Sequence, residues 1–126
     1  MSTSKIFMSD AVAKPKAPLS HAVVAGDFVF VSGTTPFDAN RELAPTFSEQ
    51  MHQVMKNLRQ ILGECDSSLD KVVKANVILT DISRFNEMNE IYRGYFQEGK
   101  FPARTTIEAP LAIAGMMLEI EVVATR

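Results

Sequence analysis

Residues 101–108 (FPARTTIE) carry an arginine, two threonines and a glutamate in a segment with the pattern of a β-strand. In a strand, Arg104, Thr106 and Glu108 would share one face, because successive side chains point to opposite faces. A guanidinium is a planar fork of donors that matches one carboxylate, so Arg104 is a candidate to bind a small acid. The alternative is a surface ion pair between Arg104 and Glu108 or a neighbouring strand, which is a common and weak interaction.

A second group of charged residues lies in the last predicted strand, residues 117–124. Its alternation places Glu119 and Glu121 on one face and an apolar row of Leu118, Ile120 and Val122 on the other. If this strand is a neighbour of the strand that carries Arg104, one of the two acids can approach the guanidinium. The alternation alone leaves open which acid does so, and a solvated carboxylate at a strand edge is the alternative for both.

Other polar residues have ordinary structural roles open to them. Ser32 ends a predicted strand and Asn89 lies in a predicted helix, so they could cap a turn and occupy a helix surface. His21 and His52 have no partner visible in the sequence, which favours structural or solvent-facing positions. Cys65 is the only cysteine, which excludes an intrachain disulfide and a cysteine-based metal cluster and favours a buried filler.

The length and charge of the chain exclude several classes of function. At 126 residues the chain fits a single domain, residues 1–126. Its 13 basic and 15 acidic residues do not make the cationic surface that binding many phosphates requires, so no nucleic-acid partner is expected. No apolar run approaches the roughly 20 residues that span a bilayer, and the polar N-terminus lacks the core of a signal peptide. We expect a soluble, cytoplasmic protein with no membrane partner.

The order of elements predicts an α+β fold. Two apolar runs, residues 21–24 and 28–32, flank Gly26 and Asp27 and predict a β-hairpin. A capping box from Thr46 to Glu49 begins a helix that ends near Gly63. The remaining predicted elements are a short strand at residues 5–8, a strand at 72–80 with an apolar row of Val73, Ala75, Val77 and Leu79, and a helix from about Ser83 that Gly99 and Pro102 stop.

These elements predict a two-layer sandwich, in which a mixed β-sheet carries both helices on one face. The strand, helix, strand order requires a crossover that makes its two strands parallel or near neighbours. The second hairpin strand is apolar on both faces, so the uncovered sheet face is expected to pack against another copy of the chain. Polar residues on that face would then lie in a cleft between subunits, which suits a small-molecule site.

Four segments together resemble the reactive intermediate deaminase family, also called the YjgF or Rid family. They are AGDFVFVSG at residues 25–33, residues 85–92 with Asn89, FPAR at residues 101–104 and EIEV at residues 119–122. The resemblance covers nearly the whole chain from Pro18 onward. It implies a chorismate-mutase-like fold and a homotrimer with a barrel-like centre, with sites at the subunit interfaces.

The resemblance also implies an activity: hydrolysis of carboxylate-bearing enamines and imines, such as 2-aminoacrylate, to a 2-keto acid and ammonia. It implies no metal and no organic cofactor. Carried onto this chain, Arg104 would hold the substrate carboxylate and Glu119 would position or activate the attacking water. Ser32 and Asn89 would line the pocket. Orientation, a delivered water and proton transfer near neutral pH are sufficient for an imine, which is already electrophilic.

The chain departs from the family pattern at the pocket. Leu19 follows Pro18 where many members have a tyrosine, Thr106 stands where many have a cysteine, and His21 stands where glutamine is frequent. Leu19 and Thr106 are therefore expected to shape substrate binding, and another unsaturated amine such as aminomuconate is an open alternative. Two further classes stay open: a trimeric protein that binds small carboxylates without turnover, and a ribonuclease, which the acidic balance disfavours.

Overall fold

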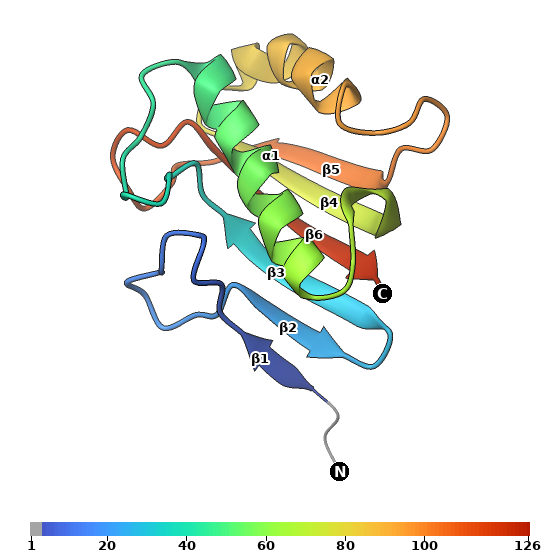
Figure 1. Cartoon of the computed structure of the whole chain (residues 1–126). Coiled ribbons are helices and arrows are strands. Elements are labelled where there is room, and N and C mark those ends of the chain that lie inside the picture. The colour runs from blue at the N-terminus through green and yellow to red at the C-terminus, as the bar shows by residue number, and fades with distance from the viewer. Residues whose placement is uncertain (1–3) are drawn as a thin grey trace.

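The computed structural model describes residues 4–126 as one six-stranded sheet with two helices (Figure 1). The strands are β1 (Lys5–Phe7), β2 (Ala22–Ala25), β3 (Phe28–Thr34), β4 (Val72–Leu79), β5 (Ala103–Glu108) and β6 (Leu118–Thr125). The helices are α1 (Phe47–Glu64) and α2 (Phe85–Arg93), with 3₁₀ turns at Leu69–Lys71 and Ile82–Arg84. The strand order is β1-β2-β3-β6-β4-β5, and only the β4–β5 pair is parallel. The predicted α+β class with a mixed sheet is confirmed.

The predicted hairpin and first helix are also confirmed. β2 and β3 pair antiparallel around Gly26, whose φ of 58° is accessible to glycine without strain. Thr46 caps α1, since its hydroxyl accepts a hydrogen bond from the Glu49 N–H at 3.2 Å. The helix ends at Glu64, and the thiol of Cys65 is buried beneath it, as the sequence predicts.

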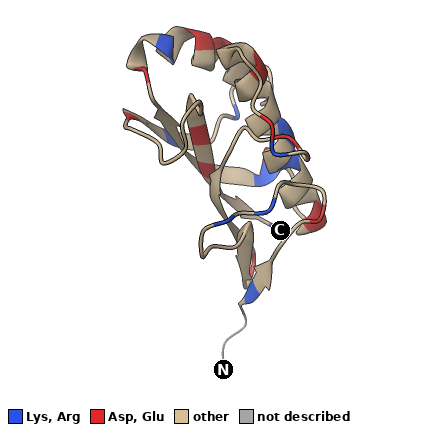
Figure 2. Cartoon of the chain, turned by 90° about the vertical axis from the view of Figure 1, so that its left-hand side faces the viewer, with Lys and Arg blue, Asp and Glu red and all other residues tan. Residues whose placement is uncertain are grey.

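Both helices cover one face of the sheet, as the side view in Figure 2 shows. The buried side chains of α1 pack on the inward rows of β3, β4 and β6 to form the core. β3 and β4 run in the same direction, and β6 lies between them, so they are near neighbours as the crossover requires. The opposite sheet face keeps Phe28, Phe30 and Ile107 exposed by 44%, 46% and 48%.

Two local predictions need correction, and the open question of whether the last two strands are neighbours is answered. α2 ends at Arg93, well before Gly99, because Gly94 weakens the helix and the next N–H groups bond three residues back in a tighter turn. A register shift between Val72 and Lys74 turns Val72 inward and leaves Val73 46% exposed, so Val73 does not belong to the buried row. β5 and β6 are not neighbours, because β4 separates them.

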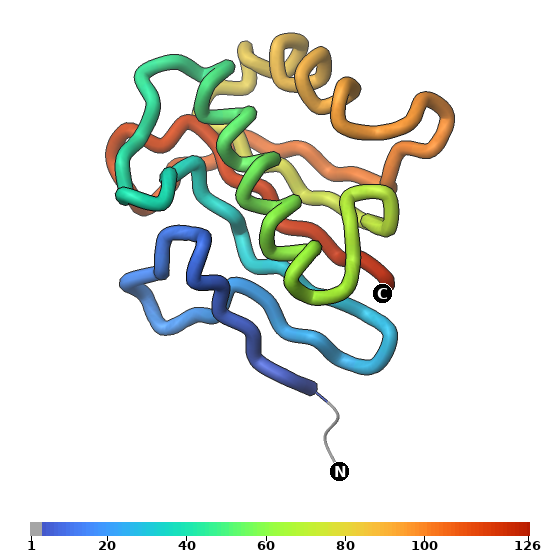
Figure 3. The backbone as a smooth tube through the Cα atoms, in the orientation of Figure 1, coloured from blue at the N-terminus to red at the C-terminus, as the bar shows by residue number. Residues whose placement is uncertain are grey.

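The chain between β1 and β2 makes a long excursion over one end of the sheet. The tube in Figure 3 follows this segment as it leaves β1, loops outward and returns to β2. His21 fixes its return: the ring Nδ1 accepts the Ser9 N–H at 2.9 Å and Nε2 donates to the Ala13 carbonyl at 2.9 Å. The histidine is buried and has a structural role, as predicted.

Candidate active site

Arg104 lies on the edge strand β5 and faces α2. Its strand partner Ala75 is fully buried in the core, and directly paired residues point to the same sheet face. The guanidinium carbon lies 4.8 Å from the centroid of the Tyr92 ring and 5.7 Å from that of Phe85, and Nη1 lies 3.9 Å from the Met88 sulfur. The cation therefore rests against aromatic and thioether groups rather than against an acid.

The surface ion pair considered from the sequence is not what the structure shows for Arg104. Glu108, its proposed partner, instead accepts a hydrogen bond from the Ile82 N–H at 2.8 Å. The ion pairs among residues 4–126 join Lys14 with Asp10, Arg84 with Glu87, and Arg93 with Glu98. Arg104 takes part in none of them, so its positive charge is free to bind an anion.

Three buried polar atoms around this strand and helix have no hydrogen-bond partner: Asn89 Oδ1, Tyr92 Oη and Thr106 Oγ1. Asn89 and Tyr92 lie one turn apart on α2, and Thr106 lies two residues after Arg104 on the same face of β5. Burial raises the pKa of the Tyr92 hydroxyl, and the charge of Arg104 lowers it in part. Unpaired buried polar groups are costly in a folded protein, so those of Asn89 and Tyr92 on one helix, with Thr106 near Arg104 on β5, indicate a place prepared for a ligand or water.

A cleft of about 370 Å³ opens at this place. Its walls are Asn89, Tyr92, Arg93, Phe101, Pro102 and Arg104. The FPAR segment thus supplies one wall and α2 the other, which explains why Arg104 and Asn89 come together although they are distant in sequence. We call it the arginine cleft.

Glu119 lines a second cavity of about 200 Å³, together with Leu19, Ser32 and Gly33. We call it the glutamate cavity. Burial raises the pKa of the Glu119 carboxyl, and the neighbouring charge of Glu121 raises it further. Glu121 does not line this cavity and instead accepts a hydrogen bond from the Asn76 amide at 2.8 Å. Glu119 thus lines the glutamate cavity, whereas Glu121 lines a different hollow together with Asn76 and Lys74.

Buried amides of α1 hold the loops around the glutamate cavity. Asn57 donates to the carbonyls of Thr35 and Phe37 at 3.0 and 2.8 Å. Gln50 donates to the Gly115 carbonyl at 3.0 Å and accepts from the Met117 N–H at 2.9 Å. These bonds satisfy loop backbone groups that the core would otherwise leave unpaired. Helix α1 therefore positions the loop that follows β3 and the loop that precedes β6.

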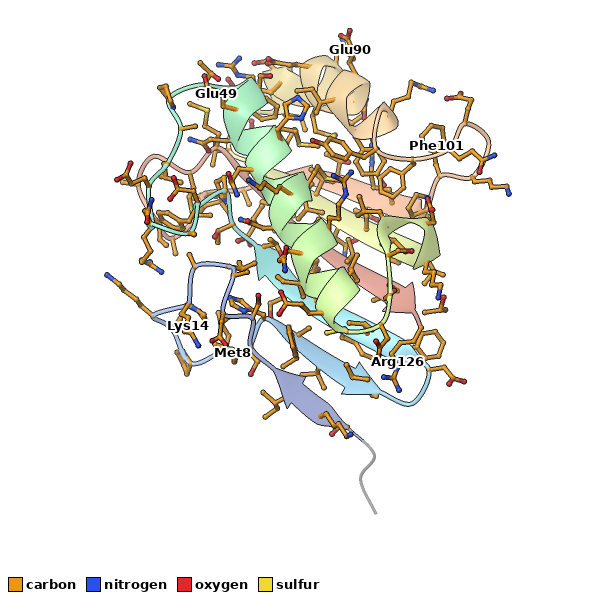
Figure 4. The ribbon with its side chains drawn as sticks, in the orientation of Figure 1. Met8, Lys14, Glu49, Glu90, Phe101 and Arg126 are labelled. Atoms are coloured by element: carbon orange, nitrogen blue, oxygen red, sulfur yellow. The ribbon has the colours of Figure 1, made fainter. Side chains whose placement is uncertain are left out.

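Arg104 and Glu119 do not meet within one chain. Glu119 pairs with Ile78, which in turn pairs with Ile107, so Glu119 shares the helix-free face with Ile107 while Arg104 faces the helices. Figure 4 shows the separation. Phe101, which lines the arginine cleft, lies beside α2, whereas Lys14, whose neighbours Ala13 and Pro15 line the glutamate cavity, lies on the opposite side of the molecule. The idea that adjacent strands would bring the acid to Arg104 is therefore wrong for the single chain.

The structure thus sorts the predicted site residues into two groups. Arg104 and Asn89 line the arginine cleft, with Thr106 beside Arg104, whereas Glu119, Ser32 and Leu19 line the glutamate cavity. Tyr92 is buried in the core, as helical spacing predicts, but the sequence did not indicate that its hydroxyl would be unpaired beside Arg104. Within residues 4–126, no three His, Cys, Asp or Glu side chains form a group that could hold a metal ion.

Residues 8–126 match the protein family described as endoribonuclease L-PSP. The chain belongs to this family, which includes the YjgF and Rid proteins. It is 39% identical to the mitochondrial protein MMF1 of Saccharomyces cerevisiae over 119 residues, which are 93% of this chain and 81% of MMF1.

Two solved structures show the same fold. One is YyfA of Yersinia pestis, a member of the conserved Rid family of unknown function, at 28% identity and a TM-score of 0.92 over 98% of this chain and all of YyfA. The other is TdcF of Escherichia coli with bound serine, at 26% identity and a TM-score of 0.89 over 97% of this chain and 98% of TdcF.

In this Rid-family chain, the segments that carried the resemblance occupy the two sites. FPAR opens β5 at the arginine cleft, the end of the hairpin supplies Ser32 and Gly33, and the acidic segment of β6 supplies Glu119. No helix in residues 4–126 has the length and hydrophobicity needed to cross a membrane.

Proposed function

We propose that this Rid-family protein hydrolyses imines and enamines that carry a carboxylate, giving a 2-keto acid and ammonia. The observation that carries the proposal is Arg104: a cation without an acidic partner, set in a cleft beside three unpaired polar atoms. Such a guanidinium would bind a carboxylate strongly, because aromatic neighbours shield it from water without neutralising it. The serine bound to TdcF, a small molecule with a carboxylate, agrees with this ligand class.

We further propose that the site is completed by a second copy of the chain in a homotrimer. One chain keeps Arg104 and Glu119 in separate places, although the reaction needs both at one substrate. The exposed Phe28, Phe30 and Ile107 on the helix-free face give that assembly an apolar surface to bury. In this arrangement the arginine cleft of one subunit meets the glutamate cavity of the next.

The chemistry assigned to these residues is simple. Arg104 holds the substrate carboxylate, which fixes C2 of the imine in place. Glu119, in its ionised form, accepts a proton from a water molecule as the water oxygen bonds to C2 of the protonated imine, and the C=N electron pair moves to the nitrogen, which becomes a neutral amine. Glu119 then returns its proton to that nitrogen, the C–N bond breaks with its electron pair on nitrogen, and ammonia leaves. The remaining hydroxyl loses its proton to give the keto acid.

An enamine such as 2-aminoacrylate enters the same path after one proton reaches its methylene carbon, which converts it to the imine. The raised pKa of Glu119 suits this exchange of protons near neutral pH. No cofactor is part of this proposal. We place the protein in the cytoplasm on the grounds of sequence, although the relative MMF1 is mitochondrial.

The family description names a ribonuclease, but the chain itself offers less support for RNA. Its formal net charge is −2, and acidic and basic residues are interspersed along the ribbon in Figure 2. RNA binding depends on a cationic surface that neutralises several phosphates. The alternative is a protein that binds carboxylates without turnover. It would use Arg104 in the same way and would differ only in that Glu119 transfers no proton.

The test is ammonia release from 2-aminoacrylate and from imines generated in situ, with and without the protein. We expect acceleration by the wild type and a loss of about 100-fold or more in kcat/KM for Arg104→Ala. Arg59→Ala is the matched control, because Arg59 also lies over a tyrosine ring, that of Tyr95, at 5.4 Å but outside both sites. Carboxylate binding without acceleration would replace the enzyme by the binding protein, and equal rates for wild type and Arg104→Ala would refute the site.

A further inference from the structure

The glutamate cavity has walls that are mainly hydrocarbon. The apolar side chains that line it come from the loop after β1, the loop after β3 and the loop before β6: Val12, Ala17, Leu19, Phe37, Ile113 and Met116. Leu19 and Ile113 remain 47% and 40% exposed, so part of this apolar lining is accessible from outside. Walls of this kind favour a ligand with an apolar group that can be buried against them.

Three polar side chains of the cavity already form hydrogen bonds with backbone groups. The Ser32 hydroxyl donates to the Ser20 carbonyl at 2.6 Å, and the Thr34 hydroxyl donates to the Ser32 carbonyl at 3.0 Å. Both ring nitrogens of His21 are used by backbone groups. The two hydroxyls can still accept a hydrogen bond, but none of these three side chains can donate one to a ligand carboxylate without giving up its present bond.

The one cationic residue of the cavity is also engaged. Arg41 Nη1 donates to the Lys14 carbonyl at 2.5 Å, and the guanidinium lies 4.9 Å from the centroid of the Phe37 ring. Glu119 contributes a negative charge whenever it is ionised. A second carboxylate on a ligand would therefore meet hydrocarbon walls and the like charge of Glu119, and Arg41, which the Lys14 carbonyl and the Phe37 ring hold, would be the single cation of the cavity to balance it.

We propose that the glutamate cavity binds the substrate side chain, and that the preferred substrate is a 2-imino acid with a branched aliphatic or aromatic side chain. This inference rests on the proposed function, in which Arg104 of the neighbouring subunit holds the carboxylate of the same substrate. The volume fits, since an apolar cavity of about 150 Å³ accommodates benzene and this one measures about 200 Å³. Imino acids of this class arise when the Cα–N bond of an apolar amino acid is oxidised.

Two other substrates fit the cavity less well. 2-Aminoacrylate carries only a methylene group and would leave the hydrocarbon walls without contacts. Aminomuconate carries a second carboxylate, which would lie among hydrocarbon walls and near the like charge of Glu119. Leu19 and Ile113 are thus the residues that select between side chains, because they are apolar, line the cavity and remain accessible.

The inference is tested with imines made in situ by enzymatic oxidation of leucine, phenylalanine, alanine and glutamate. We expect kcat/KM for the leucine and phenylalanine imines to exceed that for the alanine imine by at least about tenfold, because each methylene bound in an apolar pocket adds roughly that factor. The glutamate imine should be the poorest. Equal rates for all four, or a preference for alanine or glutamate, would overturn the substrate class while leaving the deaminase in place. Acceleration of none of them would instead overturn the proposed function.

A second experiment tests the substrate preference with the variant Leu19→Lys. It should lower kcat/KM for the leucine imine by about tenfold and raise it for the glutamate imine, since the new ammonium can pair with the second carboxylate. Ile82→Lys is the matched control, because Ile82 is 43% exposed and lines neither site. Leu19→Ser gives an uncharged variant that should lose only the leucine preference. An unchanged leucine-to-glutamate ratio in both Leu19 variants would exclude Leu19 as the selecting residue.

Discussion

Gly33 leaves the space that the Glu119 carboxylate occupies. A Cβ added at residue 33 would lie 2.9 Å from Glu119 Oε1, closer than such atoms approach in proteins, and 3.0 Å from its Cδ, which is also a very tight contact. The glycine lies at the end of β3, where the pairing with β6 shifts register between Val31 and Thr34. The backbone of one strand therefore determines where the carboxylate of its neighbour can lie.

Gly33→Ala should consequently displace the Glu119 side chain while leaving the fold largely intact, because the contact involves the flexible end of a side chain. We expect a loss of about 10- to 100-fold in kcat, measured with the preferred imine, since small displacements of a reacting group cost about this much. Gly63→Ala is the control, because no atom lies within 4 Å of its added Cβ. That helical variant should keep full activity and gain up to about 1 kcal/mol in unfolding free energy. Full activity of Gly33→Ala would show that the position of Glu119 is unimportant.

The pH dependence of the reaction should follow Glu119. Burial, and then the charge of Glu121, raises the pKa of its carboxyl, and the proposed role requires the ionised form. Activity should therefore fall as the pH drops through this raised pKa. Glu121→Gln removes the neighbouring charge, so the acidic limb should move to lower pH, whereas Glu119→Gln should remove the activity. An acidic limb unchanged in Glu121→Gln would contradict this assignment.

The raised pKa of Glu119 also predicts how the stability of the fold depends on pH. An acid whose pKa is higher in the folded than in the unfolded state favours folding less as it ionises, so the unfolding free energy should fall as the pH rises through that window. Glu119→Gln removes this dependence. The stability of the variant relative to the wild type should increase from pH 4 towards neutral pH and then level off, as measured by urea denaturation at each pH.

Much of the fold follows from local sequence patterns, and the corrections have physical causes. The cap at Thr46 and the turn at Gly26 are local signals, and they predict their elements correctly. The register shift beside Val73 and the insertion of β6 between β3 and β4 depend on contacts between distant segments. The unpaired hydroxyl of Tyr92 has no local signal at all, because helical spacing marks only the side of the helix on which it lies.

The hydroxyl of Tyr92 provides a test of the arginine cleft. It is buried without a partner, so Tyr92→Phe should leave the unfolding free energy equal to or above that of the wild type. If the hydroxyl bonds to the bound substrate, KM should rise by about tenfold while the ring keeps supporting Arg104. Tyr95→Phe is the control, since its hydroxyl bonds to His52 Nδ1 at 2.5 Å outside the cleft. That variant should lose about 1 kcal/mol of stability or less and keep its KM.

A mixing experiment tests whether one active site needs two chains. Arg104→Ala chains keep Glu119, and Glu119→Gln chains keep Arg104, so each is expected to be inactive alone. When the two are unfolded together in equal amounts and refolded as mixed trimers, about a quarter of the interfaces should join an intact arginine cleft to an intact glutamate cavity. Activity should return towards about a quarter of the wild-type value.

The control for this experiment uses a variant in which both residues are changed in the same chain. Chains with Arg104→Ala and Glu119→Gln together, refolded with wild-type chains, should also leave about a quarter of the interfaces intact, because both halves must come from wild-type subunits. If Arg104 and Glu119 of the same chain formed the site, this second mixture would keep about half of the wild-type activity and the first mixture would have none. Native mass measurements on both mixtures establish that the chains have exchanged, so the activity of the first mixture decides between a site shared by two subunits and a site within one.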